Sequence, residues 1–86
     1  MSSLAADPSP VLLNEALFEN SMAQAAILLT WAAPNGAWVE HGQRLAEVLV
    51  EDMRHEIVAP VSGRIVDAVP ASTVLEPGDL LCRLAP

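Results

Sequence analysis

The largest group of ionisable side chains lies between residues 47 and 56. It holds four carboxylates, one arginine and one histidine: Glu47, Glu51, Asp52, Glu56, Arg54 and His55. Two carboxylates can work as general acid and general base only when burial or a pocket drives their pKa values apart. The segment "VEDMRHEIVAP" (50–60) is typical of two short strands joined by a tight turn, which leaves its polar side chains in solvent. We therefore expect a solvated acidic edge here, and no catalytic residue.

The remaining reactive side chains form no recognisable constellation. His41 and His55 belong to separate turns and lack the spacing of metal ligands. Neither a nucleophile–base pairing nor a glycine-rich phosphate loop is present. The single cysteine, Cys82, cannot form an internal disulfide, and its place beside Leu81 and Arg83 in an apparent strand predicts a small buried apolar side chain. The sequence predicts neither an enzyme nor a metal site.

The charge balance limits the kind of partner. Eleven carboxylates stand against four cations, all arginines, and the formal net charge is −7. Such a chain repels phosphate backbones and anionic lipids, so we expect no nucleic acid and no membrane as partner, and favour a cationic patch on another protein. The longest apolar run, residues 25–33, is too short to span a bilayer. With no secretion signal visible, we expect a soluble, cytoplasmic protein.

The chain divides into a leader and one domain. Residues 1–10 are small, polar and rich in proline, and we expect a flexible N-terminal leader. Residues 11–86 form the predicted domain. Residues 11–22 allow either a first strand over 11–13, which we favour, or a helical turn or two. Beyond residue 25 the segments are short, rich in aliphatic residues and separated by Pro and Gly turns, which predicts an all-β fold.

The sequence also repeats itself after 36 positions. Shifting residues 29–50 along by 36 aligns an aliphatic residue, Glu, any residue, Gly, two residues and Leu in both halves. We therefore expect a flattened β-barrel or sandwich of two four-stranded antiparallel sheets with pseudo-twofold symmetry. Six aliphatic residues should be buried in its core: Leu45, Val48, Ile57, Ile65, Leu81 and Leu84.

Four segments, in order and at matching spacing, carry a resemblance to a known family. They are "LFENSM" (17–22), "GAWVEHGQRLAEV" (36–48), "EIVAPVSGRI" (56–65) and "VLEPGDLLCRL" (74–84). Together they make the chain similar to the biotinyl/lipoyl carrier domains, the swinging-arm modules of 2-oxo acid dehydrogenase complexes and biotin-dependent carboxylases. The resemblance implies a β-domain whose cargo is attached to a lysine at the tip of a hairpin.

The position of that lysine can be counted from both sides. Counting forwards from Leu45 and backwards from Ala59-Pro60 by the family's spacing leads in each case to Asp52. A rival register, in which "EDMRH" (51–55) corresponds to the biotin-type motif, puts Arg54 there instead. The chain contains no lysine at all. Attachment needs a neutral primary amine, which neither side chain supplies, so we predict that no cofactor is bound.

Two functions follow from the resemblance. The first is a biotinyl/lipoyl-like domain without covalent cofactor, acting as a non-catalytic protein-interaction or assembly module through its hairpin: Glu51, Asp52, Met53 and Arg54. The alternative is a lipoyl-type fragment or paralogue associated with a 2-oxo acid dehydrogenase or acyltransferase complex. In either case the expected partner is a protein, such as a dehydrogenase, acyltransferase or carboxylase component. Because a small β-domain has unpaired edge strands, a homodimer is also considered.

Overall fold

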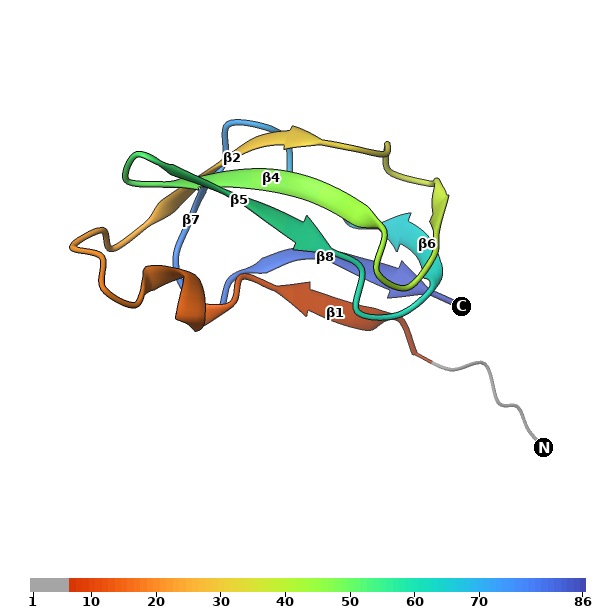
Figure 1. Ribbon diagram of the computed structural model, residues 1–86. Helices are drawn as coiled ribbons and strands as arrows, with labels where there is room; N and C mark the ends of the chain where they lie inside the picture. Colours follow the sequence, from red (N-terminus) through yellow and green to blue (C-terminus); the bar gives the residue numbers. More distant parts are fainter. Residues whose placement is uncertain (1–6) are drawn as a thin grey trace.

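A computed structural model describes residues 7–86, which form eight strands and one short 3₁₀ helix (Figure 1). The elements are β1 (Ser9–Leu12), η1 (Glu15–Phe18), β2 (Ala26–Trp31), β3 (Trp38–Val39), β4 (Arg44–Val50), β5 (Met53–Val58), β6 (Gly63–Val66), β7 (Val74–Leu75) and β8 (Leu80–Ala85). In this part of the chain, no helix has the length and apolar character needed to cross a membrane.

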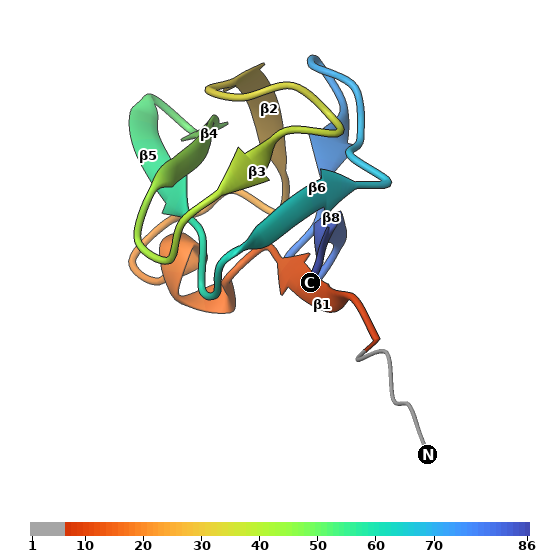
Figure 2. The ribbon, with the colours of Figure 1, turned by 90° about the vertical axis from the view of Figure 1, so that its right-hand side faces the viewer.

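The strands make two antiparallel sheets of four strands each. One has the order β1-β8-β6-β3 and the other the order β5-β4-β2-β7. Viewed from the end that carries β3 and β6, the two sheets curve around a common interior (Figure 2). The predicted fold class, all-β with two four-stranded antiparallel sheets, is confirmed.

The N-terminal region differs in detail from the prediction. Residues 1–6 of the predicted leader lie outside the described residues. Strand β1 already begins at Ser9, because Ser9 and Pro10 pair with Leu84 and Arg83 of β8. The strand favoured for 11–13 and the helical turn considered as its alternative both occur, one after the other. β1 ends at Leu12, and the Asn14 side chain then accepts a hydrogen bond of 2.9 Å from the Ala16 N–H, which caps η1.

The internal repeat corresponds to two equivalent halves. Replacing β2, β3, β4 and β5 by β6, β7, β8 and β1 converts one sheet order into the other. Connecting hydrogen bonds repeat as well: the Gly42 N–H donates to the Ala59 carbonyl and the Gly78 N–H to the Leu13 carbonyl, both at 2.8 Å. Both glycines have positive φ, 86° and 89°, so the residue that aligned the halves in sequence relieves the same turn in each.

The core contains the aliphatic side chains that the repeat predicts, with one exception. Leu45, Val48, Ile65, Leu81 and Leu84 are at most 1% exposed. Ile57 is only partly buried, because it lies on β5, the outer strand of its sheet, where a neighbour covers one side only. This part of the prediction was wrong.

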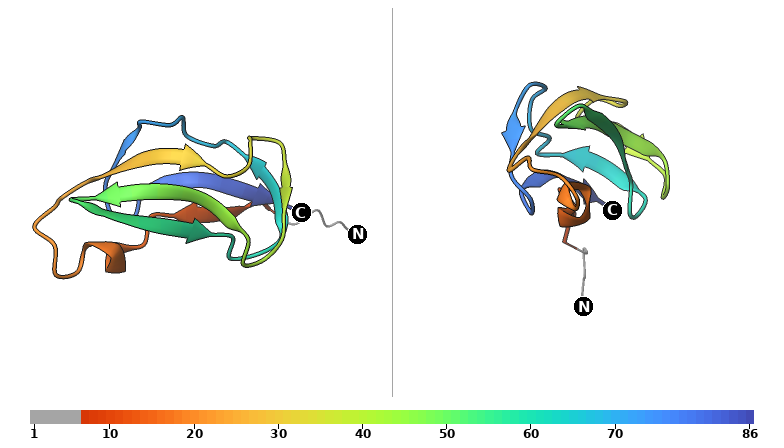
Figure 3. Two further views of the ribbon diagram at one scale, coloured as in Figure 1. Left: turned by 45° about the horizontal axis from the view of Figure 1, so that its top comes forward. Right: turned by 60° about the vertical axis from the view of Figure 1, so that its left-hand side comes forward.

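The two ends of the molecule differ. The β4–β5 hairpin and the loop between η1 and β2 extend from one end, whereas the start of β1 and the C-terminus lie at the other (Figures 1 and 3). Any function carried by the hairpin is therefore presented away from the start of β1 and from the C-terminus.

Candidate functional site

The tip of the β4–β5 hairpin is a two-residue turn. Val50 pairs with Met53, which leaves Glu51 and Asp52 as the turn residues. Glu51 has φ of 53°, in the left-handed region that two-residue hairpin turns require. Asp52 is exposed and makes no hydrogen bond or ion pair with residues 7–86. Arg54, the rival tip residue, instead lies within β5, opposite Leu49.

Glu51 holds the tip against a distant loop. Its Oε1 accepts hydrogen bonds from the Ser21 hydroxyl, from the Met22 N–H at 2.6 Å and from the Ala23 N–H at 3.2 Å. These bonds favour the ionised carboxylate and lower the pKa of Glu51, with the Ser21 hydroxyl as the largest cause. Glu51 is among the predicted interaction residues, but in the structure its carboxylate is hydrogen-bonded to the loop.

Two methionines lie exposed beside the turn. Met53 follows Asp52 and is 63% exposed, and Met22, on the loop that Glu51 holds, is 92% exposed. A shallow hollow of about 370 Å³ lies next to them, lined partly by Leu17, Asn20 and His55. Exposed methionines adapt to partners of varied shape, so the tip combines one free carboxylate with flexible apolar side chains.

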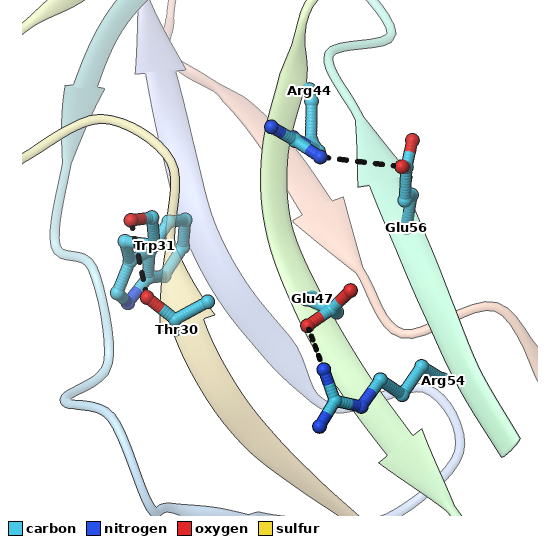
Figure 4. Close-up of polar contacts among 6 residues, drawn as sticks. All are labelled: Thr30, Trp31, Arg44, Glu47, Arg54 and Glu56. Atoms are coloured by element: carbon cyan, nitrogen blue, oxygen red, sulfur yellow. Dashed lines mark hydrogen bonds and ion pairs between the residues drawn. The ribbon is translucent and has the colours of Figure 1, made fainter.

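The other charged residues of the group lie on the outer face of the sheet, away from the tip. Arg54 approaches Glu47 at 3.6 Å, and Arg44 approaches Glu56 at 3.4 Å (Figure 4). Such exposed pairs contribute about 0–1 kcal/mol each. The predicted interaction residues therefore separate: Asp52 and Met53 are presented at the tip, whereas Arg54 belongs to an ion-pair ladder on the sheet.

The two tryptophans and a second hollow add no pairing of a nucleophile with a base. The Trp31 ring packs against the core, and its indole N–H donates to the Val69 carbonyl at 2.7 Å. Trp38 is half-exposed, and its indole N–H donates to the Glu40 carboxylate at 2.9 Å. A second hollow, of about 270 Å³, lies beside Trp31 and is lined also by Thr30, Ala46 and other sheet residues. Figure 4 shows four of the residues that line it, Thr30, Trp31, Arg44 and Glu47, and the Thr30 hydroxyl donates to the Trp31 carbonyl at 3.4 Å instead of to a base.

The remaining candidates for chemistry are dispersed. Over residues 7–86, no group of three or more His, Cys, Asp and Glu side chains could hold a metal ion. Cys82 is fully buried, as expected, and burial raises the pKa of its thiol to about 11. A thiol with that pKa stays protonated at neutral pH and is a poor nucleophile.

Comparisons with known proteins match this geometry. A family described as "Biotin-requiring enzyme", the biotin/lipoyl family, matches residues 20–84. The chain belongs to this family. Its biotin/lipoyl fold is also found in a solved structure titled as a single-chain, multi-domain long-chain acyl-CoA carboxylase, with a TM-score of 0.68 and 24% identity. The match covers 96% of this chain and 8% of the carboxylase chain. No curated protein matches the sequence.

Membership makes this a carrier-type domain, a module that in its family serves within larger enzymes. The turn of the β4–β5 hairpin, where the resemblance implies attachment, holds Glu51 and Asp52. No local pattern indicates that Glu51 binds Ser21, because 30 positions separate the two residues. A positive φ at a residue other than glycine is the local feature that marks the strained position, and it becomes visible only in the structure.

Proposed function

We propose that this is a carrier fold that works without covalent cargo, as a non-catalytic interaction or assembly module that docks through the tip of its β4–β5 hairpin. The observation that carries the proposal is Asp52 in the exposed turn of a chain without lysine. In this view Asp52 occupies the position of the family's modified lysine. A cytoplasmic location stays a prediction of the sequence.

The chemistry of attachment supports the proposal. Biotin and lipoate are joined to a carrier by attack of a neutral amine on an activated acyl group, which leaves a stable amide. The carboxylate of Asp52 could form only an anhydride, which water hydrolyses. Arg54 remains protonated and has no suitable nucleophilic nitrogen. The absence of an amine, rather than a disordered hairpin, would then keep the protein unmodified.

The geometry of the tip supports the docking part of the proposal. Asp52 and Met53 are free to contact a partner, and Glu51 fixes the neighbouring Met22 beside them. A partner of matching chemistry offers an apolar depression bordered by cations. Association of this kind weakens as salt rises, because exposed charges are screened beyond about 8–10 Å at physiological ionic strength.

A second candidate is a fragment or paralogue of a lipoyl-type domain that keeps contact with a 2-oxo acid dehydrogenase or acyltransferase complex. The solved carboxylase favours a carboxylase component as a further partner, since its chain contains a domain of this fold. These possibilities share the same docking tip and differ in the enzyme that receives it.

The experiment is the intact mass of the full chain after incubation with lipoate ligase or biotin ligase, the cofactor and ATP. We expect no mass increase for the wild type and an increase of one lipoyl group for Asp52→Lys, whose exposed position should tolerate the change within about 0.5 kcal/mol. Ala71→Lys, in another exposed turn, is the matched control and should stay unmodified. A lipoyl or biotinyl adduct on the wild type would sink the proposal.

Docking is tested by pull-down with candidate carboxylase and dehydrogenase components. Asp52→Asn and Met53→Ala should each reduce recovery of the partner, while Glu76→Gln, which removes the same charge from an exposed residue elsewhere, should not. Equal recovery with all three variants would move the interface away from the tip.

A further inference from the structure

Strand β5 is a long edge strand without the usual protection against pairing with another strand. It forms the outer strand of its sheet and is six residues long, without proline or glycine. Among the described strands, the other edges are short or interrupted: β3 and β7 have two residues each, and β1 contains Pro10, which has no N–H. Natural sheets protect their edges in these ways, and β5 has neither protection.

The backbone of β5 offers regularly spaced bonding groups to a further strand. The two-residue turn makes Val50 and Met53 the hydrogen-bonded pair that closes the hairpin. Alternation then directs the N–H and C=O groups of His55 and Ile57 toward β4, and those of Arg54 and Glu56 away from it. The outward groups of Arg54 and Glu56 have no backbone partner within residues 7–86.

On the outer face of this edge, two carboxylates lie opposite each other, and within residues 7–86 no cation lies directly opposite either of them. Glu47 and Glu56 lie directly opposite one another on β4 and β5. Like charges at such positions are destabilising. Arg54 and Arg44 reach these carboxylates only diagonally, at 3.6 and 3.4 Å, and three of the four side chains are exposed while Glu47 is partly buried (Figure 4). A cation directly opposite Glu56, on its free side, would complete the ladder.

We propose that β5 pairs antiparallel with β5 of a second copy of this chain, around a twofold axis at His55. This register places Arg54 opposite Glu56 of the second copy, and by symmetry Glu56 opposite its Arg54. Each pair exchanges backbone hydrogen bonds and also joins opposite charges. The contact is isologous, so one surface serves as its own complement.

Other residues of β5 fit the same register. Met53, which is 63% exposed, lies opposite Ile57 of the second copy, so both apolar side chains gain a neighbour. On the outer face, the row Glu47–Glu56 continues to Arg54 of the second copy. By symmetry, Arg54 is followed by Glu56 and Glu47 of the second copy, so two rows of charged side chains cross the axis from one sheet to the next. The hairpin turn lies outside the paired residues at each end.

Charge reversal separates this pairing from non-specific association. Sedimentation equilibrium of the full chain at low salt should show a monomer–dimer equilibrium. Arg54→Glu and Glu56→Arg should each weaken the dimer by at least about tenfold, because each faces a like charge across the axis. Glu56→Arg also makes the net charge less negative, so general repulsion alone predicts the opposite result. The two variants mixed should form a heterodimer, since all facing charges are then opposite.

The control is Arg83→Glu, which changes the net charge by the same amount as Arg54→Glu and breaks the exposed Arg83–Asp67 pair of 3.1 Å away from this edge. It should leave dimerisation unchanged. Circular dichroism and urea unfolding of each variant show whether the monomer is still folded. A wild type that remains monomeric up to its solubility limit overturns the proposal, as does a mixture of folded variants that forms no heterodimer.

A disulfide tests the register itself. Residues directly opposite at a position without hydrogen bonds have Cα atoms about 4.5 Å apart, within the range that a disulfide spans. His55→Cys should therefore crosslink two copies under oxidised glutathione, much faster than Glu56→Cys or the more exposed Asp52→Cys. The native Cys82 is buried and should not interfere. Fastest crosslinking at position 56 or 52 overturns this register.

Discussion

The two halves of the domain share one pairing scheme and differ where their strands end. In one half, β4 and β5 are joined by the Glu51–Asp52 turn; in the other, the equivalent strands β8 and β1 carry the two chain ends. The repeat therefore accounts for the fold, and the hairpin tip is the place where the halves cannot be alike. Features found only there are the ones to examine for function.

The outer faces of the two sheets also differ, in the residue types at equivalent positions. Val74, Ile27 and Leu49 form a row across the outer face of one sheet, and the equivalent row in the other is Trp38, Arg64 and Ala85. Positions that face the core stay apolar in both halves, whereas outward positions change character freely. Packing constrains the interior of the repeat and leaves its surface open to divergence.

The substitutions with the largest expected effect test whether the cores of the two halves are equivalent. Leu45 and Leu81 occupy matching positions and are both fully buried. We expect Leu45→Ala and Leu81→Ala each to lower the free energy of unfolding by about 2–5 kcal/mol, because each leaves a cavity. Urea unfolding measures both. A cost below about 1 kcal/mol for either variant would show that the halves pack differently.

Substitutions at Gly63 and Ala26 should have smaller effects on stability, and the two effects should differ between the halves. Gly63 matches Ala26 because it pairs with Val39 as Ala26 pairs with Leu75. A Cβ on Gly63, however, would lie 2.7 Å from the Ala85 carbonyl oxygen and 3.1 Å from the Leu84 Cβ. Gly63→Ala should therefore cost about 1–3 kcal/mol through overpacking. The mirror change, Ala26→Gly, should cost only about 0.5–1 kcal/mol, from added chain entropy. Thermal unfolding compares them, and equal costs contradict the close approach at Gly63.

The hairpin tip predicts a pH dependence that the other half lacks. The pKa of Glu51 is lowered on folding, so its bonds to the loop stabilise the protein above the unfolded value of 4.5 and are lost as pH falls through the lower folded value. In Glu51→Gln, part of the acid-induced fall in stability should disappear. Urea midpoints between neutral and acid pH measure this. Identical profiles for both proteins would mean that the contact does not persist in solution.

The smallest effect concerns two matching turns. The Gly36 N–H donates to the Ile65 carbonyl of β6 and the Ser72 N–H to the Leu28 carbonyl of β2, and the two residues have φ of 95° and 73°. The left-handed region costs a residue with a Cβ roughly 1 kcal/mol, so Ser72→Gly should be neutral or stabilising by up to about that amount. Gly36→Ser should be destabilising by a similar amount. Calorimetry of both variants checks the opposite signs.

Most of the fold could be predicted from sequence, because its main signals are repeated. Turn glycines and core leucines recur after 36 positions, and the spacing on both sides of residue 52 places Asp52 in the hairpin turn, where the structure has it. For Ser9 and Pro10 the sequence predicts a leader instead, since small residues and proline suggest no strand by themselves. Their strand depends on β8, from the far end of the chain.

The contacts within the site could not be predicted from the sequence. Glu51 and Ser21 are joined only after the sheets assemble, and no local pattern marks the pair. Arg54 is only two residues from Asp52 in sequence, yet its side chain lies on the outer face of the sheet, where it approaches Glu47. The charges of the hairpin were found by composition, but their division between tip and sheet required the register.

The pairing of β1 with β8 has a mechanical consequence. Ser9 lies opposite Leu84, so the two strands that carry the chain ends are antiparallel and leave the fold at the same end (Figure 1). Tension applied through the two ends would load the hydrogen bonds of this pair one at a time, as in a zipper, instead of shearing them together. As a link in a stretched chain, the domain would peel open from β1 first, while the hairpin at the far end still carries no load.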